Sequence, residues 1–480
     1  MNRKSVFFNF FWRLAERFGA RTVEFIVAIV LARILEPSAY GTIALVTVFI
    51  GVLNVFVDSG LGNALIQKKD ADDIDFSTVF YFNIFVCLVL YTFMFLMAPF
   101  IARFYNDVTL VPIVRALSLT IVISGVKNIQ QAYVSRTMQF KRFFFSTLGG
   151  TLGAAGLGIA LAYLGYGVWA LVAQQLFNAT VDTLILWITV KWRPIKAFSF
   201  ERLKGLFSYG WKLLVSSLID TIYNDVSQLI IGKMYSTSDL AFYNRGKQFP
   251  SFLVTNINTS IDSVLLPTMS REQDDVIRVR SMTRRAIKTS TYLIAPLMIG
   301  VACCAEPIVR IVLTEKWIDC VPFVRIFCIT FMMYPIHTAN LNAIKAMGRS
   351  DLFLKLEIQK KTIGILVLLS TMWFGPLTMA YGSLATSIIC QIINSWPNKK
   401  LLQYSYFEQI KDILPGVVLA AVMGATVYAI SFIHLPTILL LCIQIVLGCI
   451  IYVAISALLH VESFEYILSA ILAFRRKREN

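Results

Sequence analysis

Residues 76–102 read FSTVFYFNIFVCLVLYTFMFLMAPFIA, an apolar run that contains no Lys, Arg, Asp or Glu. The hydrocarbon core of a bilayer is about 30 Å thick, and an α-helix needs about 20 apolar residues to cross it. A strand of a membrane β-barrel would instead show about ten residues of alternating hydrophobicity, a pattern that this run lacks. The run therefore predicts a membrane-spanning helix.

Comparable runs lie on both sides of this stretch and follow one another along the whole chain. Together they predict an all-α polytopic membrane protein with about 14 transmembrane helices. The predicted spans are residues 14–35, 38–66, 76–102, 108–134, 143–164, 166–190, 206–234, 239–267, 286–305, 321–346, 353–374, 376–397, 413–434 and 437–460.

The composition fits a chain whose surface is covered mostly by lipid. Of the 480 residues, 57% are hydrophobic and 15% are charged, whereas about 25% of the residues in an average soluble domain are charged. So few polar side chains cannot cover the surfaces of two or three soluble domains. The composition thus excludes the soluble, disordered and disulfide-rich secreted classes of protein.

The formal net charge of +16 predicts how the chain is oriented in the membrane. Lys and Arg collect in cytoplasmic loops, because short basic loops resist translocation. With the amino terminus inside, 29 Lys and Arg residues fall in inner segments, and five fall in outer segments or at outer helix ends. We therefore predict that both termini are cytoplasmic. Because the basic segments alternate with membrane spans, we assign them to topology and expect no nucleic-acid partner.

The sequence offers little that could catalyse a reaction or hold a metal. The eight Cys residues form no C-x-x-C pair, and the three His residues are far apart, so we expect no metal and no cofactor. No predicted segment outside the membrane exceeds about twenty residues, which leaves no room for a nucleotide-binding domain. The longest outer segment, 306–320, is mostly apolar. We therefore expect a protein that is not an enzyme.

Two parts of the sequence correspond when the chain is shifted by 200 residues. VLARILEPSAYG at 30–41 matches IIGKMYSTSDLA at 230–241, and each consists of a span that ends in a cation, a short polar turn and a new span. An even number of spans between the copies predicts a parallel repeat with a pseudo-twofold axis along the membrane normal. The predicted domains are an N-terminal six-helix lobe at 1–200, a C-terminal six-helix lobe at 201–400, and two extra helices with a basic cytoplasmic tail at 401–480.

Five segments carry a resemblance to a known family. They are LARILEPSAYGTIAL (31–45), DSGLGNALIQ (58–67), SQLIIGKMYSTSDLAFYNRG (227–246), LLPTMSREQDD (265–275) and VLTEKWIDCVPFVRIFCI (312–329). They resemble polysaccharide transporters of the multidrug/oligosaccharidyl-lipid/polysaccharide exporter superfamily. The fifth segment is most similar to the branch of Wzx-type colanic-acid and teichuronic-acid exporters. One departure is Thr314, where that branch usually has Gly before Glu-Lys-Trp.

The resemblance implies a V-shaped, two-lobed flippase in the bacterial inner (cytoplasmic) membrane. Its relatives move a polyprenyl-pyrophosphate-linked oligosaccharide from the inner to the outer leaflet by alternating access, for the biosynthesis of O-antigen, capsule or exopolysaccharide. The implied partners are this lipid-linked substrate, membrane lipid, a coupling ion (H⁺ or Na⁺), a polysaccharide polymerase and glycosyltransferases.

Two other functions stay open at this point. A multidrug/cation antiporter of the same superfamily would need a mostly acidic and aromatic cavity, whereas the spans of this chain hold more cations than acids. A membrane polysaccharide polymerase or ligase would need a large outer loop with catalytic residues, which the predicted topology lacks.

Cations inside the spans are the candidates for contacting an anionic substrate. An ionised group that faces lipid costs several kcal/mol, so such groups tend to face partners or a watery cavity. Pyrophosphate supplies anionic oxygens, for which Arg is a bidentate donor and Lys a point charge. The candidate lumen cations are Arg17, Arg21, Arg115, Lys127, Lys212, Arg245, Lys247 and Arg325.

The first predicted helix permits two interpretations of its charges. Arg13, Arg17, Arg21 and Glu24 share one helical face. One interpretation is an Arg21–Glu24 pair within the helix, with the other two cations at the cytoplasmic interface. The other is a cationic stripe that faces the lumen.

Acidic residues in the spans are the candidates for ion coupling. Asp220 shares a face of the seventh predicted helix with Lys212, and Asp58 and Asp262 fall at related points of the second and eighth helices. Structural pairing with a nearby Lys or Arg is the alternative for each of them. The candidate coupling residues are Glu24, Asp58, Asp220, Asp225 and Asp262.

Overall fold

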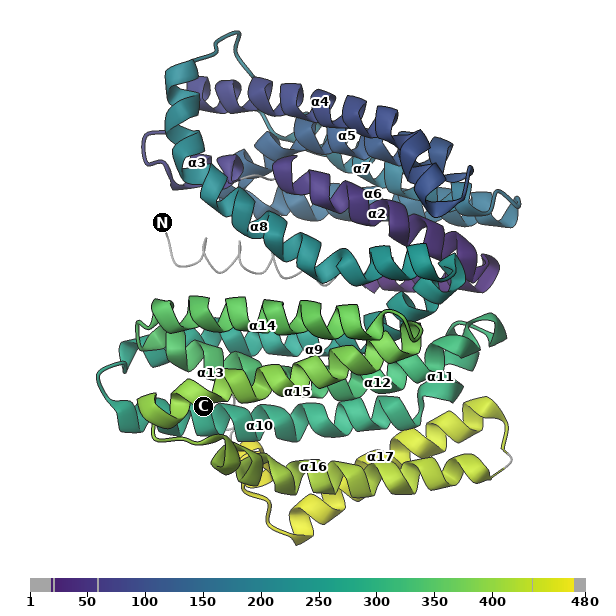
Figure 1. Ribbon diagram of the computed structural model, residues 1–480, viewed down its shortest axis with the longest axis vertical. Helices are drawn as coiled ribbons and strands as arrows, with labels where there is room; N and C mark the ends of the chain where they lie inside the picture. The colour runs from purple at the N-terminus through teal and green to yellow at the C-terminus, as the bar shows by residue number, and fades with distance from the viewer. Residues whose placement is uncertain (1–18, 20–21, 58–59, 434, 470–480) are drawn as a thin grey trace, which may run out of the picture. The chain divides into compact units, whose positions relative to one another are not determined.

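The computed structural model describes residues 19, 22–57, 60–433 and 435–469, and the regular secondary structure of these residues is helical throughout. The predicted all-α membrane fold is therefore confirmed. Three candidate site residues, Arg17, Arg21 and Asp58, lie outside the described residues. The chain forms two compact units, Met1–Ala241 and Phe242–Asn480. Figure 1 labels the helices of both units.

Unit 1 is built from helices that pack along one another. After a helical stretch at 22–34 come α2 (Pro37–Val57), α3 (Leu61–Gln67), α4 (Asp73–Tyr105), α5 (Leu110–Arg136), α6 (Phe140–Tyr163), α7 (Val168–Thr189) and α8 (Phe200–Met234). The most extensive packing joins α6 to α7 and α4 to α5, and α5 also packs against α7. The side chains of Leu65, Phe76, Ile129, Leu186 and Trp192 meet in a buried core that joins α3, α4, α5 and α7 to the segment before α8.

Unit 2 follows the same principle with more, shorter elements. α9 (Thr237–Arg271) runs into it from unit 1. It continues with α10 (Val276–Cys303), α11 (Ala305–Val312), the 3₁₀-helix η1 (Glu315–Cys320), α12 (Val321–Met332), α13 (Tyr334–Ala346), α14 (Ser350–Thr371), α15 (Pro376–Leu401), α16 (Tyr406–Ala429), η2 (Ile430–Phe432), α17 (Thr437–Leu458) and a helical stretch at 462–469. The most extensive packing joins α10 to α16 and α14 to α15.

Ten helical segments in the described part of the chain are long and apolar enough to cross a membrane. α8, α9 and α14 are long as well, but they carry too many polar and charged residues to meet the same criterion. The count of about 14 spans therefore stays a prediction. A long helix too polar for lipid must face protein or a watery cavity, which draws attention to these three.

Two predicted spans are each broken into two helices. Within 38–66, the chain bends at Gly60, whose φ of 45° favours glycine. A Cβ atom at Gly60 would lie 2.5 Å from the carbonyl oxygen of Gly210, so this glycine also lets α3 approach α8 closely. Within 321–346, Pro335 stands in the first turn of α13, where its missing N–H costs nothing. Both breaks therefore have a local cause in the sequence.

Candidate functional site

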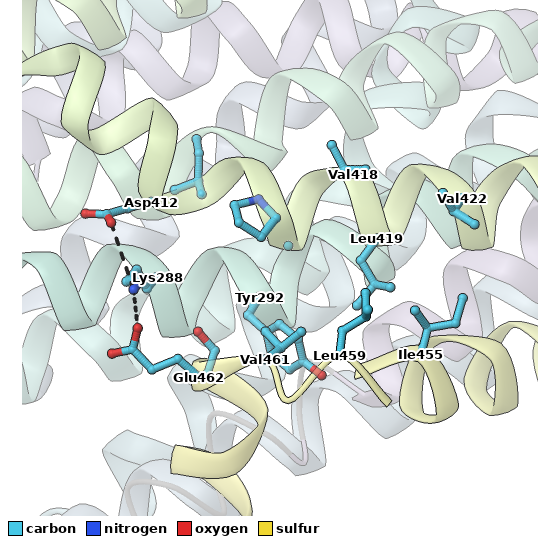
Figure 2. A pocket seen from close by; sticks show the side chains of 14 residues that line it. Lys288, Tyr292, Asp412, Val418, Leu419, Val422, Ile455, Leu459, Val461 and Glu462 are labelled. Atoms are coloured by element: carbon cyan, nitrogen blue, oxygen red, sulfur yellow. Dashed lines mark hydrogen bonds and ion pairs between the residues drawn. The ribbon is translucent and has the colours of Figure 1, made fainter. Parts of the chain in front are cut away.

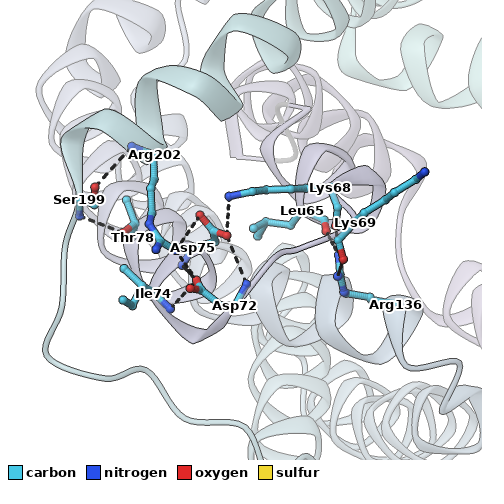
Figure 3. A network of polar contacts seen from close by, with 10 residues as sticks. All are labelled: Leu65, Lys68, Lys69, Asp72, Ile74, Asp75, Thr78, Arg136, Ser199 and Arg202. Carbon is cyan, nitrogen blue, oxygen red and sulfur yellow. Dashed lines mark hydrogen bonds and ion pairs between the residues drawn. The ribbon is translucent and has the colours of Figure 1, made fainter.

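The N-terminal end of α8, which the predicted topology places on the cytoplasmic side, is held by ion pairs to the start of α4 (Figure 3). Arg202 donates to Asp72 and lies 3.5 Å from Asp75, and Lys68 lies 2.6 Å from the other Asp75 oxygen. The Asp75 side chain is fully buried, so these cations replace its water. The hydrogen bond from Arg202, followed by that from the Asp75 N–H, lowers the pKa of Asp72 to about 2. α8 is thus fixed to the first turn of α4.

The segment that leads into α8 is fastened to the same helix. The N–H of Ile195 donates to the Ser77 hydroxyl at 2.9 Å. The N–H of Ser199 donates to the Thr78 hydroxyl at 3.1 Å (Figure 3). Both hydroxyls are fully buried. These bonds satisfy backbone groups that would otherwise be stranded where the chain enters the helix.

The opposite end of α8 is held by the last turn of α4. The Tyr105 hydroxyl donates to the Leu229 carbonyl at 3.4 Å, and Lys233 donates to the Phe104 carbonyl. The Lys233 ammonium also lies 4.4 Å from the centre of the Phe104 ring, a cation–π distance. α8 is therefore anchored at both ends against one helix.

Between these anchors, α8 leaves a polar face uncovered, which we call the α8 polar face. It consists of Lys212, Ser216, Asp220, Tyr223 and Ser227, of which the first three are exposed and the last two are half-buried. Lys212 has no acidic partner among the residues that the structure describes. It lies 12 residues beyond the start of the helix, which is about 18 Å along its axis. A lysine at this depth needs water or an anion.

The other two predicted cations of unit 1 that lie in the described residues, Arg115 and Lys127, have partners within it. The Arg115 side chain donates to the Phe95 carbonyl at 3.3 Å and lies 4.0 Å from the centre of the Phe95 ring. Lys127 on α5 pairs with Asp182 on α7 at 3.1 Å, and the two side chains are only 20% and 13% exposed. No contact within the described residues joins Arg115, Lys127 and Lys212 into one cluster.

Of the predicted cations of unit 2, Arg245 is buried, and Lys247 and Arg325 are half-buried. Arg245 is 8% exposed, donates to the Gln248 side chain at 2.6 Å, and lies 5.5 Å from the centre of the Trp317 ring. Arg325 lies 5.9 Å from the centre of the Tyr428 ring, and Lys247 is half-buried on α9. The role of all these cations in binding substrate stays a prediction.

The candidate coupling acids have different surroundings. Asp225 accepts a hydrogen bond from Gln228 at 2.8 Å, and Asp262 accepts one from Asn342 at 2.7 Å. Glu24 and Asp220 are exposed on their helices. Asp220 and Asp225 lie on α8, whereas Glu24 and Asp262 lie on other helices. The coupling role of these acids stays a prediction.

Two polar features were missed by sequence reasoning. Asp182 was not singled out, although a lone acid in the apolar stretch 166–190 was an available signal. In unit 2, Asn340 and Gln409 exchange side-chain hydrogen bonds of 2.8 and 3.1 Å, and both are fully buried. Isolated amides in apolar helices give no indication of their partner, so this pairing was not readable from the sequence.

An apolar cavity of about 410 Å³ lies between α10, α16 and the residues around the end of α17 (Figure 2). Val418, Leu419 and Val422 line its length. At one end, Lys288 pairs with Asp412 at 3.9 Å and with Glu462. These pairs attach α16 and the final described helical stretch to α10.

The part of the α8 polar face around Lys212 and Ser216 offers the chemistry for binding an anion, since it combines an exposed ammonium with a hydroxyl group, whereas Asp220 adds a carboxylate two turns further on. Within the described part of the chain, no three His, Cys, Asp or Glu residues are close enough to hold a metal ion. Charge and hydrogen bonding are therefore the means that this face has for recognising a ligand.

Comparison with known proteins gives the family of the chain. Residues 30–322 match the family model described as polysaccharide biosynthesis protein. The chain is 24% identical over 381 residues to the teichuronic acid biosynthesis protein TuaB of Bacillus subtilis, covering 78% of this chain and 79% of the relative. It is 25% identical over 318 residues to the succinoglycan biosynthesis transport protein ExoT of Rhizobium meliloti, covering 66% and 64%.

The fold also matches a solved structure, the lipid II flippase MurJ in an inward closed conformation. The TM-score is 0.76 at 13% identity, over 94% of this chain and 99% of the other. At this identity the match shows a shared fold. Together with the family match, it confirms the resemblance seen in the sequence: the chain belongs to the polysaccharide biosynthesis protein family of multi-pass membrane transporters.

Proposed function

We propose that this protein carries a polyprenyl-pyrophosphate-linked oligosaccharide across the inner membrane of a bacterium by alternating access. The family match, the relatives TuaB and ExoT, and the fold shared with a lipid II flippase support a lipid-linked glycan as cargo. Membrane glycosyltransferases would supply this substrate, and a polysaccharide polymerase would consume the product.

The observation that carries the proposal is Lys212 on the α8 polar face. Its side chain is exposed, lacks an acidic partner in the described residues, and lies about 18 Å along a helix anchored at both ends. A pyrophosphate group that passes this face would gain a charge-assisted hydrogen bond. Asp220, two turns further on, is our candidate for a residue that takes up the coupling ion.

The test compares Lys212→Ala with Lys204→Ala on the same helix. Both lysines are exposed, but Lys204 lies eight residues nearer the start of α8. A charge-assisted bond contributes about 1.5–3 kcal/mol, so losing it should weaken binding about tenfold to a hundredfold. We expect Lys212→Ala to reach the membrane in normal amounts and to fail in restoring surface glycan, and Lys204→Ala to restore it.

Protein abundance and surface glycan should be measured together in a strain that lacks its own copy of the protein. Normal glycan with Lys212→Ala would contradict the role of this lysine.

Transport itself is tested with purified protein in proteoliposomes that contain a defined lipid-linked oligosaccharide. The amount of headgroup that is accessible on each side of the membrane is measured. Absence of flipping together with efflux of a cationic drug would replace the proposal by an antiporter.

A further inference from the structure

A basic pocket lies where the turn between α5 and α6 meets the end of α7, and none of its lining residues belongs to the α8 polar face. A cavity of about 400 Å³ is lined there by Met138, Gln139, Lys141, Arg142, Phe145 and Thr189. No acidic residue is among these lining residues. The lining therefore combines two cations with apolar and amide groups, and it carries a net positive charge.

The two cations are held in place by different contacts. Arg142 donates to the Thr189 carbonyl at the end of α7, and it has no acidic partner among the residues that the structure describes. The Lys141 ammonium lies 5.8 Å from the centre of the Phe145 ring. Both are at the start of α6, a helix of 24 residues whose N-cap residue Gln139 makes no side-chain capping bond. The helix end adds to the positive potential of the pocket.

An apolar surface continues from this pocket along the two helices. Phe145 and Leu152 on α6 are 50% and 53% exposed, and Leu184 and Ile188 on α7 are 53% and 78% exposed. Their spacings of seven and four residues place each pair on one face of its helix. α6 and α7 pack along each other, and both are long and apolar enough to cross a membrane. These four side chains are therefore suited to contact lipid chains.

We propose that the pocket binds the phosphodiester headgroup of an anionic membrane phospholipid, whose acyl chains lie along the exposed side chains of α6 and α7. Two cations beside one phosphate make charge-assisted bonds, and basic pockets between membrane helices are suited to anionic headgroups. A zwitterionic headgroup gains less, because the lining offers no acid to its ammonium group. The lipid is a bound ligand of the protein and distinct from its transported substrate.

The test uses purified full-length protein in detergent, with added phosphatidylglycerol or phosphatidylcholine. The test variant is Lys141→Gln combined with Arg142→Gln. Its control is Lys399→Gln combined with Lys400→Gln. These two lysines are also adjacent cations, and both are exposed in the last turn of α15. Thermal unfolding reports stabilisation by the lipid, and native mass spectrometry counts the lipids that stay bound.

We expect phosphatidylglycerol to raise the Tm of the natural protein and of the control, with one molecule retained in native mass spectra. In the test variant, the apparent affinity should fall about tenfold to a hundredfold. Phosphatidylcholine should have little effect on any of them. The proposal would be overturned if phosphatidylglycerol raised the Tm of the test variant as much as that of the natural protein. It would also be overturned if both lipids raised the Tm of the natural protein equally.

Further arms separate the lipid from other sources of phosphate. If inorganic phosphate raises the Tm at the same concentrations as phosphatidylglycerol, the site binds free phosphate and the lipid proposal fails. If polyprenyl phosphate displaces phosphatidylglycerol at lower concentration, the pocket belongs to the substrate path and the proposal fails as well. Arg142→Lys keeps the charge near Thr189, so it should retain lipid binding even if Arg142→Gln proves unstable.

Discussion

Thr314 is a residue whose backbone and side chain are both unfavourably placed. It has a φ of 88°, a value that β-branched residues rarely adopt, and its hydroxyl is buried without a hydrogen-bond partner. The residue stands between α11 and η1, where its N–H bonds to the Val309 carbonyl at 3.0 Å. Exporters of the branch that this segment resembles usually have glycine here, and glycine tolerates this φ without strain.

We therefore predict that Thr314→Gly stabilises the protein. The change relieves backbone strain of about 1–2 kcal/mol and removes the unpaired hydroxyl. Glycine also raises the conformational entropy of the unfolded chain, but the resulting loss of stability is smaller. Tm in detergent should rise by about 1–4 °C. Thr330→Gly is the matched control, because Thr330 is helical and its hydroxyl bonds to Ile326; it should lower Tm. A lower Tm for Thr314→Gly would show that the turn depends on the threonine side chain.

The Lys127–Asp182 pair illustrates what single residues do not reveal. The sequence shows a lysine inside an apolar span, and from that alone we predicted a cation that faces the lumen. Its partner lies 55 residues away, and only the packing of α5 against α7 brings the two together. Charge inside a span could thus be recognised from sequence, but its pairing depends on tertiary contacts.

Among the helices, the ends differ most from those expected from sequence. α8, α10 and α16 begin six to ten residues before the predicted apolar runs at 206, 286 and 413. Each starts after a residue whose side chain caps the helix: Ser199, Asp275 and Ser405. Ser405 and Glu408 even form a reciprocal capping box. Hydropathy located the central parts of these helices, whereas polar capping sets where they begin.

The attachment of α8 to α4 should depend on pH through Asp72. Its folded pKa of about 2 lies below the usual 3.8. The stabilisation is therefore fully present above about pH 4 and is lost as the pH falls toward 2. Asp72→Asn removes the charge and keeps a good N-cap residue. We expect it to lower stability by about 0.5–1 kcal/mol at pH 6, the range for an exposed ion pair.

The Tm difference between the natural protein and Asp72→Asn should accordingly shrink between pH 4 and pH 2. The control is Asp351→Asn, because Arg349 also lowers the pKa of Asp351 to about 2. Arg349 and Asp351 are two residues apart in sequence, so they interact in the unfolded chain as well. The Tm difference between the natural protein and Asp351→Asn should therefore be smaller than that for Asp72→Asn. A Tm difference for Asp72→Asn that does not change with pH would mean that Arg202 contributes little through charge.

For the whole molecule, the orientation in the membrane stays a prediction of the charge distribution. Contacts within unit 1 agree on which segments share an end. Arg136 donates to the Lys69 carbonyl and Arg202 pairs with Asp72, near the start of α4, whereas Lys233 meets Phe104 at its other end. The structure therefore groups Lys69, Arg136 and Arg202, three of the predicted inner cations, at one end of α4.

Cysteine labelling can decide the orientation. Single cysteines near Lys69, Arg142, Lys196 and Arg280 should react only from the cytoplasm, and those near Ser38, Asn106 and Ser236 only from outside. The native cysteines must be replaced first, since Cys442 and Cys449 are exposed. Labelling of positions 236 and 280 from the same side would refute the topology, and with it the cytoplasmic placement of both termini.

The ion pairs between α4 and α8 also bear on the order in which this protein can be made. Arg202 lies 130 residues after its partner Asp72. A ribosome that adds about 5–20 residues per second therefore makes Arg202 about 7–26 s after Asp72. Until Arg202 has been made, Lys68 is the one of the two cations beside Asp75 that the growing chain already contains. A chain that stops before residue 200 would never supply the arginine. The ion-pair network at the start of α4 is therefore complete only after the helix that carries Arg202 has been made.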